Sequence, residues 1–239
     1  MSYLEQVNPL YIEMLSPLRK WKILSLSDLK KDTEYSGTSS GFYKVVSKLE
    51  KAKLIGSFKN PWNNQKYLYL LPKGIEALGE NKMSLGVNKD SRFHDSIVSI
   101  IGKKVLEIDI FKKLYLDFGI RGSFNLLERI PDFIVEGELK RPFNMALEVE
   151  LTQKSKQRVV DIFRTYSNSL VVNQILYITD KQSILNSYTK YLNELGGEIA
   201  QEKFLFLMAK DLTKGKVDLL DDPLWFKNQQ TSLRSIFSR

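Results

Sequence analysis

The run Asn144-Met-Ala-Leu-Glu-Val-Glu-Leu constrains the fold more than any other part of this chain. Its polar and apolar residues alternate, which is typical of a β-strand whose two faces meet different surroundings. Alternation places Glu148 and Glu150 on one face of the strand. The opposite face takes the apolar residues Leu147, Val149 and Leu151. Carboxylates buried in a sheet cost free energy unless water, a basic partner or a metal compensates them.

A second strand-like run, Arg129-Ile-Pro-Asp-Phe-Ile-Val-Glu, comes shortly before the first. Asp132 opens it sixteen positions ahead of Glu148, and a short hairpin would bring the two carboxylates side by side. Three oxygen donors that converge on one point suit Mg²⁺ or Mn²⁺. Asp132, Glu148 and Glu150 would supply these three donors.

An ion-pair network is the alternative interpretation of these acids. Arg158, Lys154 and Lys156 follow closely enough to neutralise Glu148 and Glu150, which would make these carboxylates structural and not catalytic.

The rare residue types narrow the chemistry further. The sequence has no cysteine and one histidine, which excludes thiolate zinc sites and disfavours a Ser-His-Asp triad. His94 shares a predicted helical stripe with Ile97, Val98 and Ile101, so it is a packing residue or one that supports a metal ligand through a hydrogen bond. Phosphate-binding glycine motifs are absent, so we expect no nucleotide cofactor.

Positive charge is concentrated in one segment of the chain. The formal net charge is +8, and residues 38–73 carry seven lysines against the single acid Glu50, a net of +6. Such an excess favours nucleic acid as a partner, although a solvated lysine-rich helix gives the same count.

Periodicity around this segment predicts a small helical module with a hairpin. Spacings of three and four predict a helix over residues 5–20 and a third helix that carries Phe42, Val45, Val46, Leu49 and Leu54 after a turn at residues 37–40. A short helix from Ser25 lies between them. Two β-prone runs then flank the turn residues 60–64. This order resembles a winged helix-turn-helix over about residues 5–80, in which the third helix enters the major groove of duplex DNA. The predicted DNA-binding residues are Ser39, Ser40, Lys44, Lys48, Lys51, Lys59 and Lys66. A protein-interaction platform on the same fold is the alternative.

The second part of the chain resembles the PD-(D/E)XK nuclease superfamily. Pro131-Asp132 is similar to its PD element and Glu148-Val-Glu150 to its acid-x-lysine element, with glutamate in place of the usual lysine. Tyr166, Tyr177, Tyr188 and Tyr191 fall within amphipathic segments and are expected to pack in the core or at its rim. Residues 105–128 are irregular, with β-like character from Val105 to Phe111, and residues 221–226 are expected to form a loop. The predicted order over residues 92–212, with a strand over 174–179 and an amphipathic helix around 182–195, is similar to the αβββαβ core of the PD-(D/E)XK superfamily. A winged helix ahead of such a core resembles the replication-relaxation proteins of plasmids and mobile elements. This resemblance implies DNA binding, and implies Mg²⁺-dependent endonuclease activity less directly. For cleavage of a phosphodiester, the resemblance implies that Asp132 and Glu148 would hold Mg²⁺ or Mn²⁺ and that Glu150 or Lys154 would orient or deprotonate the attacking water.

We therefore expect an α/β (α+β) chain with an N-terminal winged helix-turn-helix over residues 1–80 and a linker over 81–91. A PD-(D/E)XK nuclease-like mixed-sheet domain with a C-terminal extension would fill residues 92–239. The N-terminus lacks a signal-peptide pattern and no apolar run approaches a membrane span, which predicts a cytoplasmic protein. Double-stranded DNA is the expected partner, and a homodimer would suit a palindromic target. The non-catalytic alternative is a transcriptional regulator or replication accessory factor.

Overall fold

A computed structural model describes residues 9–80, 86–124 and 126–238 of the 239-residue chain. Its contacts divide the chain into two compact units, residues 1–100 and residues 101–239. We describe each unit by itself. The expected linker falls partly on residues 81–85, which lie outside the described residues, so a domain boundary at 81–91 stays a prediction.

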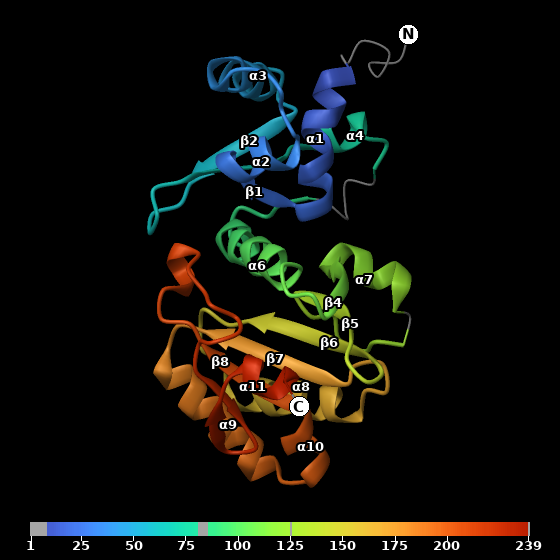
Figure 1. Cartoon of the computed structure of the whole chain (residues 1–239), viewed down its shortest axis with the longest axis vertical. Helices are drawn as coiled ribbons and strands as arrows, with labels where there is room; N and C mark the ends of the chain where they lie inside the picture. Colours follow the sequence, from blue (N-terminus) through green and yellow to red (C-terminus); the bar gives the residue numbers. More distant parts are fainter. Residues whose placement is uncertain (1–8, 81–85, 125, 239) are drawn as a thin grey trace. The chain divides into compact units, whose positions relative to one another are not determined.

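Unit 1 is a helical module with a three-stranded antiparallel sheet (Figure 1). Its elements before residue 80 are α1 (Pro9–Trp21), β1 (Ile23–Ser25), α2 (Leu26–Asp32), α3 (Ser39–Lys51), β2 (Ile55–Lys59), β3 (Lys66–Leu70) and α4 (Pro72–Ala77). The sheet order is β1-β3-β2, and β2 and β3 form a hairpin. This is the order of a winged helix-turn-helix, as the periodicity predicts.

Local side chains explain where the helices of unit 1 begin. The Ser25 hydroxyl accepts a hydrogen bond of 3.0 Å from the Asp28 amide and caps α2. Thr38 caps α3 in the same way, with 3.1 Å between its hydroxyl and the amide of Gly41. The apolar stripe of α3 is then buried in the core, at Phe42, Val46 and Leu49.

In unit 1, the start of one expected helix is not described and one strand was not expected. The first helix was expected from residue 5, but residues 5–8 lie outside the described residues. The strand β1 was not expected. It has only three residues and exists because Ile23 to Ser25 pair with β3, a contact that local sequence does not encode.

The helix α6 (Arg92–Val105) starts in unit 1 and ends in unit 2. Its expected stripe is confirmed, since Ile97 and Ile101 are fully buried and Val98 nearly so.

Unit 2 is built on a seven-stranded mixed sheet with the order β10-β9-β8-β7-β6-β5-β4. Its strands are β4 (Phe111–Leu116), β5 (Phe133–Glu138), β6 (Pro142–Val149), β7 (Gln174–Thr179), β8 (Phe204–Met208), β9 (Leu224–Phe226) and β10 (Gln229–Thr231). Its helices are α7 (Asp117–Ser123), α8 (Lys156–Asn168), α9 (Gln182–Leu195), α10 (Glu198–Lys203) and α11 (Leu233–Phe237), with a 3₁₀ turn at Leu212–Lys214. The strand pairs β6–β7 and β7–β8 are parallel and the others antiparallel.

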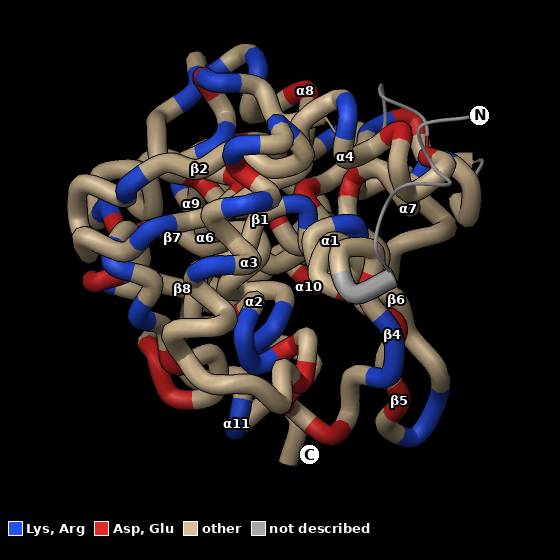
Figure 2. Tube along the Cα trace, turned by 90° about the horizontal axis from the view of Figure 1, so that it is seen from above, with Lys and Arg blue, Asp and Glu red and all other residues tan. Residues whose placement is uncertain are grey.

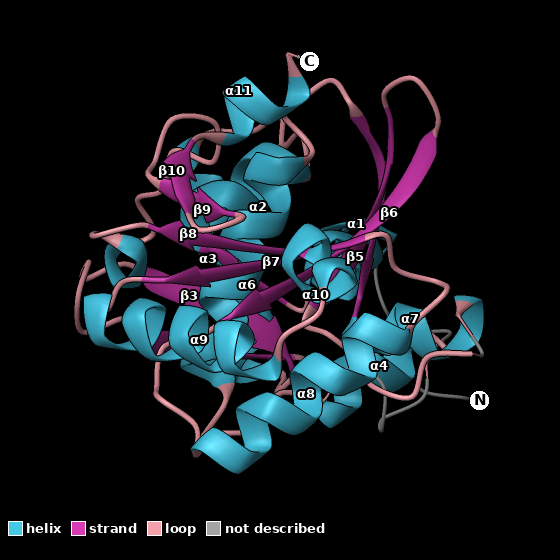
Figure 3. Cartoon of the chain, turned by 90° about the horizontal axis from the view of Figure 1, so that it is seen from below, coloured by secondary structure: helices cyan, strands magenta, loops and turns pink. Residues whose placement is uncertain are grey.

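Read in chain order, α6, β4, β5, β6, α8 and β7 reproduce the expected αβββαβ series, with α7 inserted and an extension after β7. The chain is therefore an α+β protein. Helices α8 and α9 cover one face of the sheet (Figures 1 and 3). Aromatic rings fill the layer between, where Phe163 of α8 contacts Tyr177 of β7 and Phe204 of β8. Of the four tyrosines expected in the core or at its rim, Tyr166, Tyr177 and Tyr188 are buried and Tyr191 packs against the core while partly buried.

Two segments of unit 2 correct the expectation. The β-like character from Val105 to Phe111 does not correspond to a strand, because α6 continues to Val105 and the strand β4 begins only at Phe111. The segment around Trp225 was expected to be a loop. It forms β9 instead, because Leu224 to Phe226 pair antiparallel with β8. Among the described residues, no helix is both long and apolar enough to cross a membrane.

Candidate functional site

The first candidate site is the solvent face of α3, where lysines lie opposite the buried apolar stripe. Figure 2 marks where lysines and arginines fall along the chain trace. Lys44, Lys48 and Lys51 are exposed, as predicted. Ser39 and Ser40 are also exposed and form the first turn of the helix. Hydroxyls and ammonium groups in such an array are suited to phosphate contacts.

The hairpin lysines differ from one another. Lys59 is exposed at the end of β2, directly opposite Lys66 on β3. Lys66 is half-buried and forms an ion pair with Glu50, at 2.7 Å between Nζ and Oε1. Burial raises the pKa of Glu50, but the contacts from Lys66 and Ser57 outweigh it and the pKa is lowered overall. The only acid of the lysine-rich segment is therefore ionised and already neutralised by Lys66.

Two residues near this face were missed from sequence. Lys30 of α2 donates a hydrogen bond of 2.7 Å to the Ser39 hydroxyl, which adds a cation at the N-terminus of α3. Tyr43 is 54% exposed beside Lys44, although it is a large aromatic residue. The sequence signal for Tyr43 was its place outside the apolar stripe of Phe42, Val46 and Leu49 on the helix.

The wing tip is held by Asn60, which is fully buried and accepts a hydrogen bond of 2.8 Å from the amide of Trp62. The Trp62 ring remains 51% exposed and contacts Phe93 of α6 within unit 1, with 3.9 Å between ring centroids.

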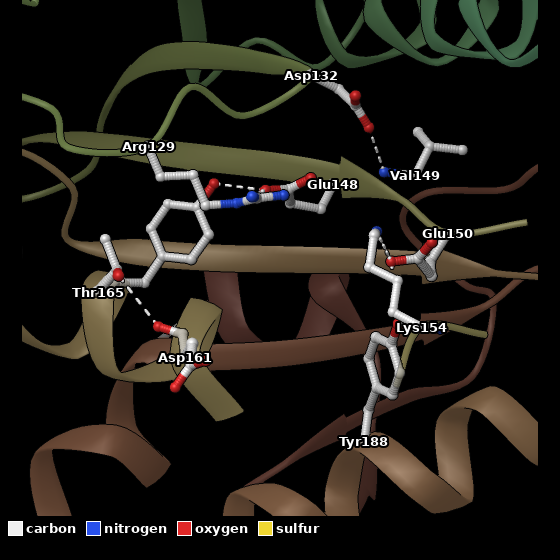
Figure 4. A network of polar contacts seen from close by, with 10 residues as sticks. Arg129, Asp132, Glu148, Val149, Glu150, Lys154, Asp161, Thr165 and Tyr188 are labelled. Carbon is white, nitrogen blue, oxygen red and sulfur yellow. Dashed lines mark hydrogen bonds and ion pairs between the residues drawn. The ribbon is translucent and has the colours of Figure 1, made fainter. Parts of the chain in front are cut away.

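The second candidate site is the group of carboxylates at the end of β6 (Figure 4). Phe133 pairs with Leu147 in the register of β5 and β6, so Asp132 and Glu148 are neighbours, as the hairpin argument predicts. The Asp132 carboxylate accepts a hydrogen bond of 2.7 Å from the amide of Val149.

Glu148 is buried against protein donors. It is 4% exposed, and its Oε1 accepts hydrogen bonds from Arg129 Nε at 3.1 Å and from the Tyr166 hydroxyl at 2.5 Å. Burial raises the pKa of Glu148, and the nearby charge of Asp132 raises it further, while Arg129 and Tyr166 oppose the shift. The same contacts raise the pKa of Arg129, so the guanidinium stays charged.

Glu150 is equally buried but has different partners. Its Oε2 forms an ion pair with Lys154 and accepts a hydrogen bond of 3.0 Å from the Tyr188 hydroxyl. Lys154 therefore does turn back to the acid four residues before it. Burial, followed by the charge of Glu150, raises the pKa of Tyr188 and keeps the phenol protonated. Since Tyr166 lies on α8 and Tyr188 on α9, both glutamates point to the helix-covered face of the sheet, as alternation predicts.

The other basic residues named from sequence do not reach these acids. Lys156 pairs with Glu194 at 2.6 Å, and Arg158 is exposed on α8. The guanidinium on Glu148 comes instead from Arg129, nineteen residues earlier. His94 lies in unit 1, with its Nδ1 3.6 Å from the carboxylate of the neighbouring Asp95.

The carboxylates do not fit the expected metal centre. In the part of the chain that the structure describes, no three His, Cys, Asp or Glu side chains form a group that could hold a metal ion. Glu148 and Glu150 are each engaged by a separate cation and a separate tyrosine (Figure 4). The arrangement is an ion-pair network.

Comparison with known proteins adds little to this geometry. The sequence matches no protein-family model and no curated protein. One solved structure is similar to this chain, with 20% sequence identity and a TM-score of 0.29. It is that of BpsR from Bordetella bronchiseptica, a protein whose DNA binding is regulated by 6-hydroxynicotinic acid. The match covers 42% of this chain and 81% of that one. A likeness of this size carries no functional argument.

Proposed function

We propose that this protein binds duplex DNA through α3 and the β2–β3 wing, and that its second unit does not cleave the DNA. The observation that carries the proposal is the exposed row of Lys44, Lys48 and Lys51 on α3. The one acid in that segment, Glu50, is neutralised by Lys66, so the row faces solvent as positive charge. Lysines of this kind neutralise phosphates without reading bases, which supports affinity more than sequence specificity.

The second half of the proposal rests on the ion-pair network at the end of β6. A Mg²⁺-dependent endonuclease at Asp132, Glu148 and Glu150 is the competing function. Glu148 and Glu150 are buried and paired with Arg129 and Lys154, which favours a regulator or replication accessory factor over a nuclease. A role in replication, relaxation or mobilisation of plasmid or mobile-element DNA rests on the family resemblance of the element order alone.

The DNA proposal is tested by the salt dependence of binding. Fluorescence anisotropy of a labelled duplex, measured over a salt series, gives the slope of log K against log salt concentration. Lys44→Ala and Lys48→Ala are each expected to weaken binding at every duplex sequence and to reduce the slope by about one released counterion.

The matched control is Lys190→Ala, which removes the same charge from the solvent face of α9 in unit 2. It is expected to leave both affinity and slope unchanged. An equal loss in Lys190→Ala would mean that net charge, and not the α3 face, governs binding. Undetectable binding of any duplex at low salt would leave the protein-interaction platform as the function of unit 1.

A further inference from the structure

The carboxylate network of unit 2 contains one charge that the nuclease resemblance does not account for. Arg129 lies just before β5 and places its guanidinium on Glu148, at 3.1 Å between Nε and Oε1 (Figure 4). The Arg129 side chain is 27% exposed, whereas that of Glu148 is only 6% exposed. The Arg129 guanidinium is thus closer to solvent than the Glu148 carboxylate that it contacts.

We infer that Arg129 is the resident cation of this site. Its guanidinium supplies the positive charge that a divalent metal would otherwise supply. Asp132 and Glu148 are neighbours in the β5–β6 register, and two adjacent carboxylates need a positive charge near them. Lys154 neutralises Glu150. Arg129 therefore supplies a cation to Glu148 from the chain itself.

The geometry makes Arg129 and a metal mutually exclusive. An ion bound to Glu148 would lie within a few ångström of the guanidinium, where two positive charges repel strongly at low dielectric. Arg129 also keeps its charge under all conditions in which the protein folds, so it cannot yield by losing a proton. The Tyr166 hydroxyl, at 2.5 Å from the same Oε1, is a further group that a metal would have to displace.

Removal of the guanidinium should therefore open the site to a divalent ion. The test uses the full chain after treatment with a chelator, and it measures uptake of Mn²⁺ from the electron paramagnetic resonance signal of the free ion. The wild type is expected to take up no Mn²⁺. Arg129→Met, which keeps a comparable apolar stem, is expected to bind about one Mn²⁺ and to lose it again when Asp132→Asn is added.

Thermal unfolding supplies a second readout on the same proteins. Without metal, Arg129→Met is expected to lower the Tm by about 10 °C, because Glu148 is left as an uncompensated buried charge. Added Mn²⁺ should recover part of that loss by mass action, and it should leave the wild-type Tm unchanged. The control Arg158→Met removes an exposed guanidinium from α8 and should behave as the wild type in both measurements.

Two results would overturn the inference. One is Mn²⁺ uptake by the wild type that Asp132→Asn removes, since the site would then hold a metal with Arg129 in place. The other is a folded Arg129→Met protein that takes up no Mn²⁺. If Arg129→Met does not fold, Arg129→Met with Glu148→Gln removes both charges and should regain stability relative to Arg129→Met alone. Failure to regain it would contradict the pairing. None of these results depends on whether α3 binds DNA.

Discussion

Asp95 forms a largely buried ion pair with Lys22. Its carboxylate lies 3.1 Å from Lys22 Nζ, and both side chains are 13% exposed. Burial raises the pKa of Asp95, but the neighbouring His94 and the charge of Lys22 outweigh burial and lower the pKa below its ordinary value of 3.8. The carboxylate is therefore favoured in the folded state.

The sign of the pH effect follows from that direction. A lowered folded pKa contributes stability that is present above the unfolded value and is lost as pH falls through the folded value. Asp95→Asn is expected to reduce the free energy of unfolding by about 2 kcal/mol at pH 7. Below pH 3.8 the difference from wild type should shrink. Denaturant unfolding at several pH values measures it.

Asp90→Asn is the control, since Asp90 is exposed two residues before the start of α6. A deficit for Asp95→Asn that stayed the same from pH 7 to pH 3 would show that the carboxylate charge is not responsible.

At the carboxylate site, two features could be predicted from the sequence and one ion pair could not. Alternation predicted that Glu148 and Glu150 share a face, and spacing predicted that Lys154 is in reach of Glu150; both are confirmed. Arg129 was not identified as the partner of Glu148. It reaches that acid only through the register of β5 and β6, and local spacing favours the nearer Arg158.

The helix α4 lies close to the backbone of Leu54, the residue before β2, at Gly74. A Cβ added to Gly74 would lie 2.1 Å from the carbonyl oxygen of Leu54, a backbone atom that cannot move aside. Gly74→Ala is therefore expected to destabilise unit 1 by about 3 kcal/mol or more, through overpacking. Thermal or denaturant unfolding of the variant measures the effect.

Gly122→Ala in α7 is the matched control, because nothing lies within 4 Å of the added Cβ. The same substitution there should be neutral or stabilising by up to about 1 kcal/mol, owing to the higher helix propensity of alanine. If the two variants lost stability to the same degree, steric contact at Gly74 could not be the cause.

The elements also differ in how readily sequence reveals them. β7 and α9 occupy the expected residues, because a continuous apolar run and a clean helical stripe each have one interpretation. β4 was missed since it is an edge strand with two exposed lysines and an irregular register between Phe111 and Lys113. β9 was missed because three residues form a strand only when β8 is there to pair with them.

At the scale of the whole molecule, the two units carry different kinds of charge. Unit 1 presents exposed lysines on α3, whereas unit 2 buries its central acids and pairs them within the chain. Positive charge that remains in solvent is available to a partner, and charge that is paired inside a core is not. The fold class could be predicted from element order, but the state of the acidic site could not, because it depends on side-chain contacts across several elements.

The intact chain should therefore bind DNA through unit 1 without cleaving it through unit 2. Supercoiled plasmid incubated with the protein and Mg²⁺ or Mn²⁺ should remain supercoiled, under conditions in which anisotropy shows that the protein binds DNA. Asp132→Ala and Glu148→Ala should give the same result as the wild type. Binding with no nicking follows from an exposed lysine row combined with carboxylates already neutralised by Arg129 and Lys154. Nicking by the wild type that both substitutions abolish would instead establish a metal-dependent endonuclease, with the guanidinium displaced during catalysis.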